Sequence, residues 1–286
     1  MKRALIFAHF DIDGIVDPYV KCYLSELRKY VHTLIFVSTS VSEGELEKIK
    51  STCDIALNKK NVGYDFASWK YGLDFLENKI DFDEIIFAND SVYAPVNSLD
   101  YFFRASEKLD SQFWGATANL QVEEHIQSFF FGFRRKLVQS KLFSDFWNGV
   151  VDLENKDDII SQYEVGLTRK LTDHGYKFAS VFDPKSIRAH RKIRAAFNDV
   201  RYRDQGILSR LVKSITKAGS PKSPMHYFWD CVLDSGVPMI KIELLRDNPC
   251  KLDESAIWKY LELHPEFCAR IKNHLFRINR NKQRLP

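Results

Sequence analysis

Closely spaced cysteines and long apolar runs are both missing from this sequence. Its 286 residues include five cysteines, and no two of them form a Cys-x-x-Cys pair. Neither a zinc site nor a disulfide framework is therefore expected. No apolar run approaches the roughly 20 residues that span a bilayer. The apolar stretch at the N-terminus ends at Asp11, too early for the core of a signal peptide, so we expect a cytoplasmic protein.

The chain also lacks a strong charge of either sign. It has 42 Lys and Arg against 38 Asp and Glu, a net charge of +4, and no nucleic-acid-binding motif, so no nucleic-acid partner is expected. Hydrophobic residues at 45% and charged residues at 28% are typical of a folded globular protein and exclude a disordered one. The length allows one large domain or two small ones.

Short apolar runs alternate with segments of helical spacing as far as residue 90. The runs predict buried strands at residues 3–10, 33–37, 54–57 and 84–88. Helices are predicted in the segments between them, at residues 17–30, where apolar residues recur at helical spacing, at 42–50, which begins with the capping-box pattern of Ser42 and Glu45, and at 66–77. This alternation predicts an α/β fold with a mostly parallel central sheet flanked by helices. Further strands are predicted at residues 113–118, 128–133, 177–182 and 238–244, and further helices at 161–174 and 255–276.

Polar residues follow each predicted strand of the first half. They are His9, Asp11 and Asp13 after the first strand, Ser38 and Thr39 after the second, Asn61, Gly63 and Asp65 in the loop after the third, and Asn89 and Asp90 after the fourth. Ligands of such sheets bind outside the carboxyl ends of the strands. A carboxylate at a strand end commonly holds a divalent cation against a diphosphate, so Asp90 is the candidate ligand for Mg²⁺ or Mn²⁺.

The first of these loops also allows a different chemistry. An apolar strand followed by Asp-x-Asp-Gly is typical of haloacid-dehalogenase-type phosphatases, in which the first Asp attacks phosphorus and the second protonates the leaving group. Asp11 would then be the nucleophile and Asp13 the acid. A turn rich in Asp and Gly is the alternative that needs no chemistry.

Two segments of the second half carry further candidates. Glu164 stands at the predicted start of the helix at residues 161–174, where a carboxylate either caps the helix dipole or serves as a general base. Residues 224–249 contain His226, Trp229, Lys241 and Arg246. The two cations suit the charge of a diphosphate, and the alternative for each is a solvated surface position.

Together these segments resemble the rhamnan synthesis F proteins, glycosyltransferase-like proteins of bacterial surface polysaccharide assembly. The resemblance covers residues 4–249 and includes AHFDIDGIVDPYVKCYLSEL, NVGYDFASWKYGL, IIFANDSVYAPV and YEVGLTRKLTDHGY. It implies a GT-A-like nucleotide-sugar fold. It also implies transfer of L-rhamnose from dTDP-L-rhamnose onto a growing polysaccharide, with inversion at the anomeric carbon. The phosphatase remains an alternative, as does a binding protein that keeps the fold without catalysis.

The resemblance also implies roles for individual residues. Glu164 stands eleven residues before Gly175 and Tyr176, where the similar family-2 glycosyltransferases keep their catalytic base. The polar strand-end residues, with Lys241 and Arg246, would bind the donor nucleotide. Asp90 would bind the metal, with His190 as a further ligand. The acceptor sugar would lie against Trp114, His125, Gln127, His226 and Trp229.

The same resemblance suggests how the chain is divided. Residues 1–250 would form the transferase domain, with a nucleotide-binding half at 1–112 and an acceptor half at 113–250, and residues 251–286 a helical basic extension. Residues 269–286 contain six Lys and Arg and no acid, interleaved with Leu275, Phe276 and Ile278. Such a segment suits peripheral docking on the anionic inner face of the bacterial inner membrane, where a lipid-linked or oligosaccharide acceptor would be met.

Overall fold

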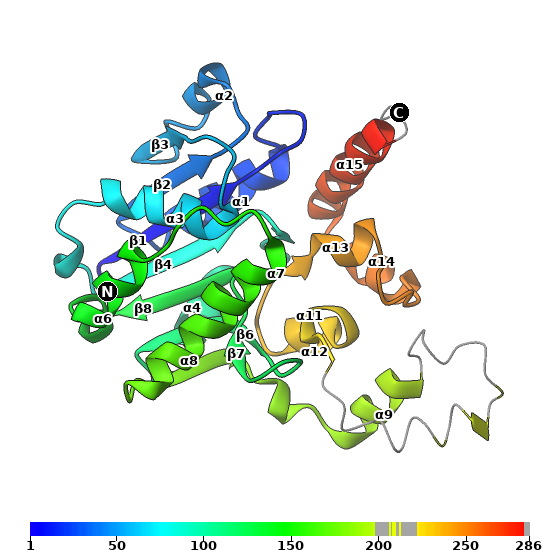
Figure 1. Cartoon of the computed structure of the whole chain (residues 1–286). Helices are drawn as coiled ribbons and strands as arrows, with labels where there is room; N and C mark the ends of the chain where they lie inside the picture. Colours follow the sequence, from blue (N-terminus) through cyan, green and yellow to red (C-terminus); the bar gives the residue numbers. More distant parts are fainter. Residues whose placement is uncertain (198–205, 207, 210–211, 213–221, 283–286) are drawn as a thin grey trace.

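A mixed sheet of eight strands runs through the chain, in the order β3-β2-β1-β4-β8-β6-β7 with β9 paired to β6 (Figure 1). The computed structural model describes residues 1–197, 206, 208–209, 212 and 222–282. The strands of this sheet are β1 (Arg3–His9), β2 (Thr33–Ser38), β3 (Ile55–Asn58), β4 (Glu84–Asn89), β6 (Phe113–Asn119), β7 (His125–Ile126), β8 (Phe130–Arg134) and β9 (Phe178–Phe182). A separate small sheet pairs β5 (Val92–Tyr93) with β10 (Ile240–Lys241).

Most neighbours in the large sheet are parallel. Strands β3, β2, β1 and β4 run in the same direction, β8 runs antiparallel to both β4 and β6, and β9 is parallel to β6. The carboxyl ends of β1, β2, β3 and β4 therefore meet at one edge. The predicted α/β fold, a mostly parallel sheet flanked by helices, is confirmed.

Each face of the sheet is covered by its own set of helices. Because side chains alternate along a strand, Ala4, Ile6 and Ala8 of β1 enter one core while Leu5 and Phe7 enter the other. The first core is completed by α3 (Tyr64–Phe75), α5 (Arg135–Val138), α6 (Lys141–Asn148), α7 (Lys156–Ile159) and α8 (Gly166–Asp173). The second is completed by α1 (Pro18–Arg28), α2 (Glu43–Glu47), α4 (Leu99–Glu107), α9 (Ala189–Phe197), α11 (Pro224–Tyr227), α12 (Trp229–Asp234), α13 (Ile242–Arg246), α14 (Ser255–Leu261) and α15 (Pro265–Lys282). Short 3-10 turns lie at Lys79–Asp81 and Pro184–Ser186.

Two predicted elements near the C-terminus are wrong. Residues 229–233, for which the sequence predicts no element, form part of helix α12, and the apolar side chains of Val232 and Leu233 lie three and four positions after Trp229, which is the helical period. Of residues 238–244, only Ile240–Lys241 form a strand in the described chain. The predicted helix at 255–276 is two helices, α14 and α15, because Pro265 begins the second and disfavours helical backbone at the residue before it.

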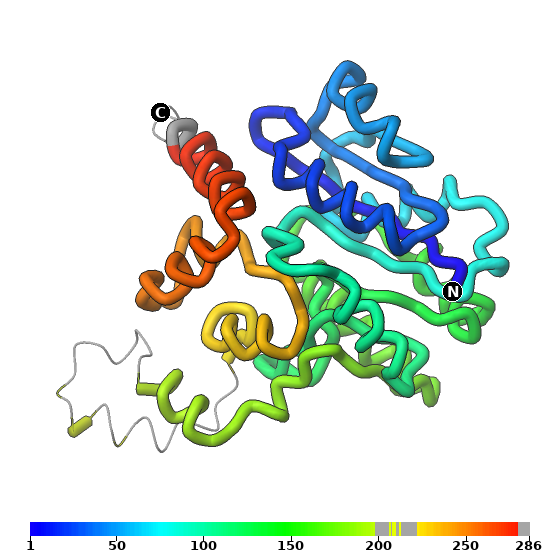
Figure 2. Tube along the Cα trace, turned by 180° about the vertical axis from the view of Figure 1, so that it is seen from behind, coloured from blue at the N-terminus to red at the C-terminus, as the bar shows by residue number. Residues whose placement is uncertain are grey.

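The last two helices belong to the main body of the molecule. Ile257 of α14 and Ile271 of α15 are fully buried in the same core as β1. Helix α15 lies beside α1 in both Figure 1 and Figure 2. Tyr93 and His274 share a buried hydrogen bond of 2.7 Å. The predicted boundary at residue 250 stays a prediction, but the described part of residues 251–286 shares its core with the first half of the chain.

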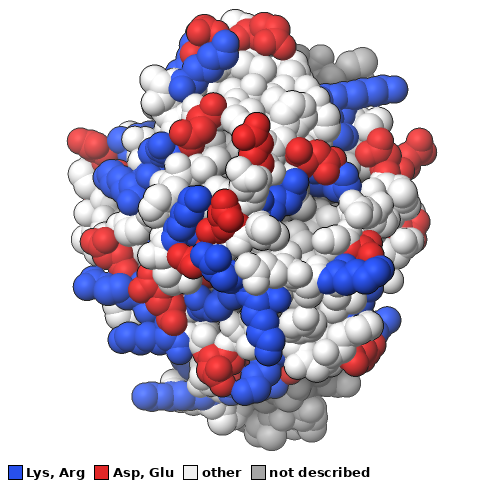
Figure 3. Space-filling view, turned by 90° about the vertical axis from the view of Figure 1, so that its left-hand side faces the viewer, with Lys and Arg blue, Asp and Glu red and all other residues white. Residues whose placement is uncertain are grey.

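Basic and acidic side chains are interspersed on the face shown in Figure 3. No single-sign patch dominates that face. No helix in the described part of the chain is both long enough and apolar enough to cross a membrane.

Candidate functional site

Four of the predicted residues meet where β1 and β4 end. Asp90 Oδ2 accepts a hydrogen bond from the N–H of Phe10 (2.9 Å) and lies 3.9 Å from Nε2 of His9. Asn89 donates its side-chain N–H to Oδ2 of Asp65 (2.8 Å), which stands in the first turn of α3. The parallel arrangement of β1 and β4 brings these side chains together, as the strand-end argument predicts.

The two carboxylates in this group are held in low-dielectric surroundings. Burial raises the pKa of Asp90 to about 8, and the charge of Asp65 adds to the effect. Burial also raises the pKa of Asp65, although its hydrogen bond from Asn89 and the charge of Lys241 oppose the shift. Burial lowers the pKa of His9 to about 4, so its imidazole is neutral at pH 7. This edge of the sheet is therefore polar, acidic and largely shielded from water.

The prediction that Glu164 stands at the start of a helix is wrong, because Glu164 lies inside a helical stretch. It belongs to a π-helical turn, η2 (Ile160–Val165), which joins α7 to α8 without a break. The dipole-cap interpretation fails for this reason. Single π-helical turns inside α-helices are frequent at functional sites because they displace one side chain from the regular helical face.

Two residues beside β7 and β8 hold the Glu164 carboxylate. The N–H of Ser128 donates to Oε2 (2.9 Å), and the Ser128 hydroxyl donates to the same oxygen. Nε2 of His125 lies 3.3 Å from Oε1. Burial raises the pKa of Glu164, but the contact with His125 and the hydrogen bonds from Ser128 outweigh burial and lower it overall. Burial likewise lowers the pKa of His125, and Glu164 reverses that shift into a net rise. Glu164 is thus an ionised carboxylate in a fixed position at neutral pH.

Lys241 connects these two groups of residues. Its Nζ donates to Oγ of Ser91 (2.9 Å), the residue after Asp90. The charges of Glu164 and Asp65 both act on Lys241, although burial has the larger effect and lowers its pKa. The structure therefore brings Glu164, Asp65 and Lys241 into one electrostatic neighbourhood. Ser91 is predicted as an oxygen ligand beside Asp90, and the structure instead pairs it with Lys241. Ser128 is not among the predicted residues, because a lone serine beside a strand carries no signal in the sequence.

Several predicted donor residues have mainly structural contacts. Ser38 is fully buried, its hydroxyl lies 3.0 Å from Nδ1 of His9, and it also accepts hydrogen bonds from the N–H groups of Ser40 and Val41. Thr39 is partly buried and Asn61 is exposed. Gly63 precedes α3 with φ of +74°, and a Cβ there would lie 2.5 Å from Cβ of Ala67, so only glycine fits. Arg246 is exposed and forms an ion pair with Asp247.

Asp11 and Asp13 are bound by Arg277 of α15. The guanidinium contacts both carboxylates and also Asp17, at 3.1 Å from one oxygen of Asp11 and 3.1 Å from one of Asp17. A nucleophilic Asp11 would have to break these ion pairs, so we do not retain the phosphatase alternative. The contact also corrects the prediction that Arg277 belongs to a free basic membrane face. Nothing in the local sequence signals a contact across 264 positions.

The predicted acceptor residues differ in their contacts. Trp114 is wrong as a sugar-stacking residue, because its side chain is fully buried and donates to Oε1 of Glu84 (2.7 Å). His125 is brought to Glu164, as described above. Gln127 accepts a hydrogen bond from the Thr117 hydroxyl (2.6 Å), His226 lies 3.5 Å from Glu243, and partly buried Trp229 packs edge-on against Tyr260. Sugar contacts at Gln127, His226 and Trp229 stay predictions.

The strand-end oxygens fit a divalent cation poorly. Asn89 Oδ1 already accepts from the N–H and hydroxyl of Ser91, and the Ser91 hydroxyl accepts from Lys241. No group of three or more His, Cys, Asp or Glu side chains in the described residues could hold a metal ion. His190 is exposed at the start of α9, which lies well apart from the end of β4 in Figure 1. Asp90 stays a predicted metal ligand, but the described residues do not complete a group of three potential ligands around it.

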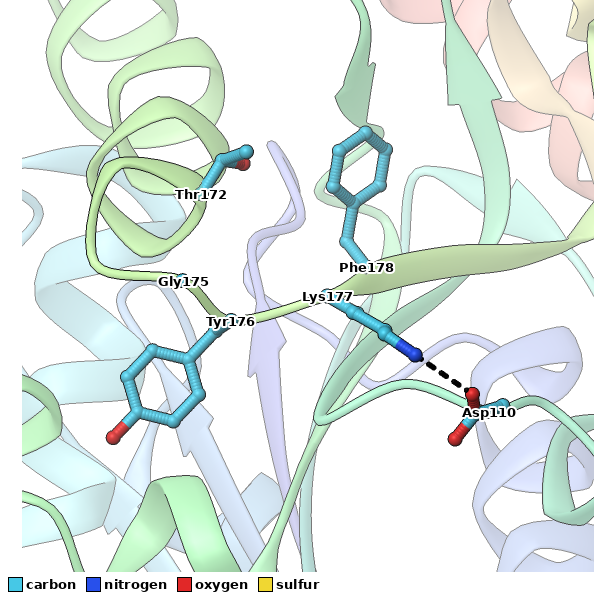
Figure 4. Close-up of a pocket in the computed structure, with 6 residues that line it drawn as sticks. All are labelled: Asp110, Thr172, Gly175, Tyr176, Lys177 and Phe178. Atoms are coloured by element: carbon cyan, nitrogen blue, oxygen red, sulfur yellow. Dashed lines mark hydrogen bonds and ion pairs between the residues drawn. The ribbon is translucent and has the colours of Figure 1, made fainter.

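A hollow of about 420 Å³ lies away from this site (Figure 4). It is lined by Asp110, Thr172, Gly175, Tyr176, Lys177 and Phe178. In Figure 4 Lys177 points toward Asp110, its ion-pair partner at 3.0 Å. The hollow stands where β6 and β9 begin, at the opposite edge from the carboxyl ends, so it is separate from the cluster of carboxylates and Lys241.

A mostly parallel sheet with carboxylates and a lysine gathered at its strand ends defines an α/β protein with a charged strand-end site. The chain belongs to the rhamnan synthesis protein F family, whose model matches residues 34–216. That description concerns the synthesis of a polysaccharide. The predicted family is confirmed, and with it the assignment to the glycosyltransferase-like proteins of polysaccharide synthesis.

Three similar proteins illustrate the comparison. Virulence protein VirA of Vibrio anguillarum is 30% identical over 289 residues, covering 96% of this chain and 91% of its own length. A mannosyltransferase of Pyrobaculum calidifontis, solved with GDP-Man and Mn²⁺, is 11% identical with a TM-score of 0.39, over 94% of this chain and 84% of that one. The 4-diphosphocytidyl-2C-methyl-D-erythritol synthase of Anaerococcus prevotii is 13% identical with a TM-score of 0.42, over 64% of this chain and 89% of that one.

Proposed function

We propose that this chain is a glycosyltransferase that moves a sugar, L-rhamnose, from dTDP-L-rhamnose onto a growing bacterial surface polysaccharide. The observation that carries the proposal is the ionised Glu164 carboxylate, held by Ser128 and His125 beside Lys241 at the strand-end site. The rhamnosyl donor is supported by the family description. The nucleotide would lie along the ends of β1 and β4, near His9 and Asp90.

The reaction would be a single displacement that inverts the anomeric carbon. Glu164 would take the proton of an acceptor hydroxyl as that oxygen attacks, because a buried, ionised carboxylate in fixed position is an effective general base. Lys241 would stabilise the negative charge that grows on the departing diphosphate. The acceptor would be an oligosaccharide or a lipid-linked sugar, approached from the side of His125.

Glu164→Gln tests this proposal. The amide keeps the shape and accepts no proton, so turnover should fall about 10²- to 10⁴-fold while dTDP binding stays nearly unchanged. Turnover is measured as dTDP release from dTDP-L-rhamnose with an oligosaccharide acceptor, and donor binding by calorimetry. Asp173→Asn, an exposed carboxylate at the end of α8, is the matched control.

A fully active Glu164→Gln protein would overturn the assignment of the base. Donor binding without turnover in the unaltered chain would instead identify a binding protein that keeps the fold without catalysis. We also propose peripheral contact with an anionic membrane through the basic residues of α15 that do not bind the core.

A further inference from the structure

Strand β10 carries Lys241 into the site. Lys241 stands opposite Val92 in the antiparallel pair of β5 and β10, and the next residue, Ile242, donates its N–H to the carbonyl of Ser91 (3.1 Å). These main-chain bonds fix the base of the lysine side chain. Its Nζ then donates to Oγ of Ser91 (2.9 Å). The ammonium therefore lies at Ser91, in the turn 89–91 that begins with the last residue of β4.

No carboxylate lies close enough to neutralise Lys241. Within the described residues its Nζ has no Asp or Glu oxygen within 4.0 Å, and its contacts are the Ser91 hydroxyl and the face of the Phe129 ring at 5.2 Å. The charges of Glu164 and Asp65 reach it from farther away. An ammonium has three N–H donors, and Ser91 takes one of them. Because a partly buried cation without a close partner is costly, this position favours an anion that supplies the missing partners.

A divalent cation at the same turn would compete with this ammonium. Ser91 presents its hydroxyl to Lys241, and Asn89 presents its carbonyl oxygen to Ser91. A metal bound through Asp90, the residue before Ser91, would share this turn with a fixed positive charge that repels it. At this turn the positive charge is therefore supplied by the protein itself, through the ammonium of Lys241.

We propose that Lys241 takes the place of a divalent cation at the donor diphosphate, so that this chain binds a nucleoside diphosphate without metal. The inference rests on the proposed function, since it names the group that neutralises the donor. It replaces the sequence-based expectation of Mg²⁺ or Mn²⁺ at Asp90.

The transfer step balances without a metal. The bond between the anomeric carbon and the diphosphate oxygen breaks, and its electron pair stays on that oxygen. The acceptor oxygen forms the new bond, and its proton passes to Glu164. Lys241 keeps its proton throughout and donates hydrogen bonds to the diphosphate as negative charge grows there.

Calorimetric titration with dTDP, UDP and GDP tests the inference, each in EDTA and in Mn²⁺, with the unaltered chain and with Lys241→Met. At least one diphosphate should bind with affinities that agree within about twofold in the two buffers. Lys241→Met should weaken its binding about 10- to 100-fold, the effect expected for loss of a charged hydrogen bond, with a much smaller effect on the matching nucleoside. Lys241→Arg should retain part of the affinity. Lys177→Met, which removes a lysine at the opposite edge of the sheet, should change nothing.

The possible results distinguish a failure of the metal-free inference from a failure of the proposed transferase function. Binding that needs Mn²⁺ would overturn the inference and leave the transferase proposal intact, even if Lys241→Met does not fold. Metal-free binding that Lys241→Met leaves unchanged would also overturn it. No binding by any of the three diphosphates in either buffer would overturn the proposed function itself.

Discussion

His125 and Glu164 stabilise each other over a limited range of pH. The pKa of His125 is raised above its ordinary 6.5 and that of Glu164 is lowered below its ordinary 4.5, because their contact outweighs burial. The His125 contribution is complete below pH 6.5 and is lost as pH rises through the raised value. The Glu164 contribution is complete above pH 4.5 and is lost as pH falls through the lowered value. The pair should therefore stabilise the fold most at about pH 5–6.

His125→Gln should remove the contribution that the contact between His125 and Glu164 makes to the free energy of unfolding. We expect the difference in free energy of unfolding between the unaltered chain and the variant to be larger at about pH 5.5 than at about pH 8.5, measured by urea denaturation. Taking the difference cancels titrating groups common to both proteins, His9 and Asp90 among them. His174→Gln, an exposed histidine at the end of α8, should show no such trend. A difference that is the same at both pH values would contradict the coupling.

Individual side chains were predicted unevenly from the sequence. Asp90 and Glu164 could be singled out because carboxylates near strand ends and helices have a known chemistry, and their roles stay predictions. Trp114 was assigned to a sugar although it lies in the core, since an aromatic residue looks the same in the sequence whether it meets a ligand or Glu84. Ser128 was missed because its role depends on the position of a helix that follows it by some thirty residues.

At the scale of elements, the side chain of Arg277 connects α15 to the loop after β1 through ion pairs. Arg277→Met would leave Asp11, Asp13 and Asp17 without their shared cation. Breaking a buried ion pair costs about 3–5 kcal/mol. The Arg277 side chain is 22% exposed, so a loss of about 2 kcal/mol in the free energy of unfolding is expected. Denaturant titration measures this loss, and amide exchange should show faster opening of the loop after β1.

The same helix supplies the control for that experiment. Arg270 forms an ion pair with Glu266 on the surface of α15, so Arg270→Met should change the free energy of unfolding by about 0.5 kcal/mol or less. Equal losses for the two variants would mean that the contact with the three aspartates does not fasten the helix.

The alternation of strands and helices up to residue 90 was predictable because each buried strand is a compact apolar run. The C-terminal elements were harder. A five-residue apolar segment such as 229–233 fits either a strand or a buried helix, and its spacing alone does not distinguish the two. The π-helical turn at Glu164 has no counterpart in hydrophobic spacing at all.

At the scale of the whole molecule, the basic residues of the C-terminal segment should govern membrane contact. Vesicles of anionic phosphatidylglycerol should carry the unaltered chain upward in a flotation gradient, and neutral phosphatidylcholine vesicles should not. Replacing Arg270, Lys272, Arg280, Lys282 and Arg284 by Gln should abolish flotation, while Arg277 is kept because it holds the fold. Undiminished flotation of that variant would exclude this segment as the membrane contact.

The assembly of the site could be predicted in outline only. The edge of the sheet follows from the parallel topology, so the meeting of His9, Asn89 and Asp90 was foreseeable. Lys241 was named for its charge, but its place beside Ser91 depends on the pairing of β5 with β10, two strands of two residues each. Pairings this short leave no pattern in the sequence.

The pairing of β5 with β10 has a consequence for how the protein is made. Lys241 follows Ser91 by 150 residues, so a ribosome that adds about 5–20 residues per second delivers it about 8–30 s after its partner. For that interval the nascent chain carries the strand-end residues Asn89, Asp90 and Ser91 without Lys241. A chain cut short before residue 240 would therefore contain every strand of the large sheet and still lack Lys241.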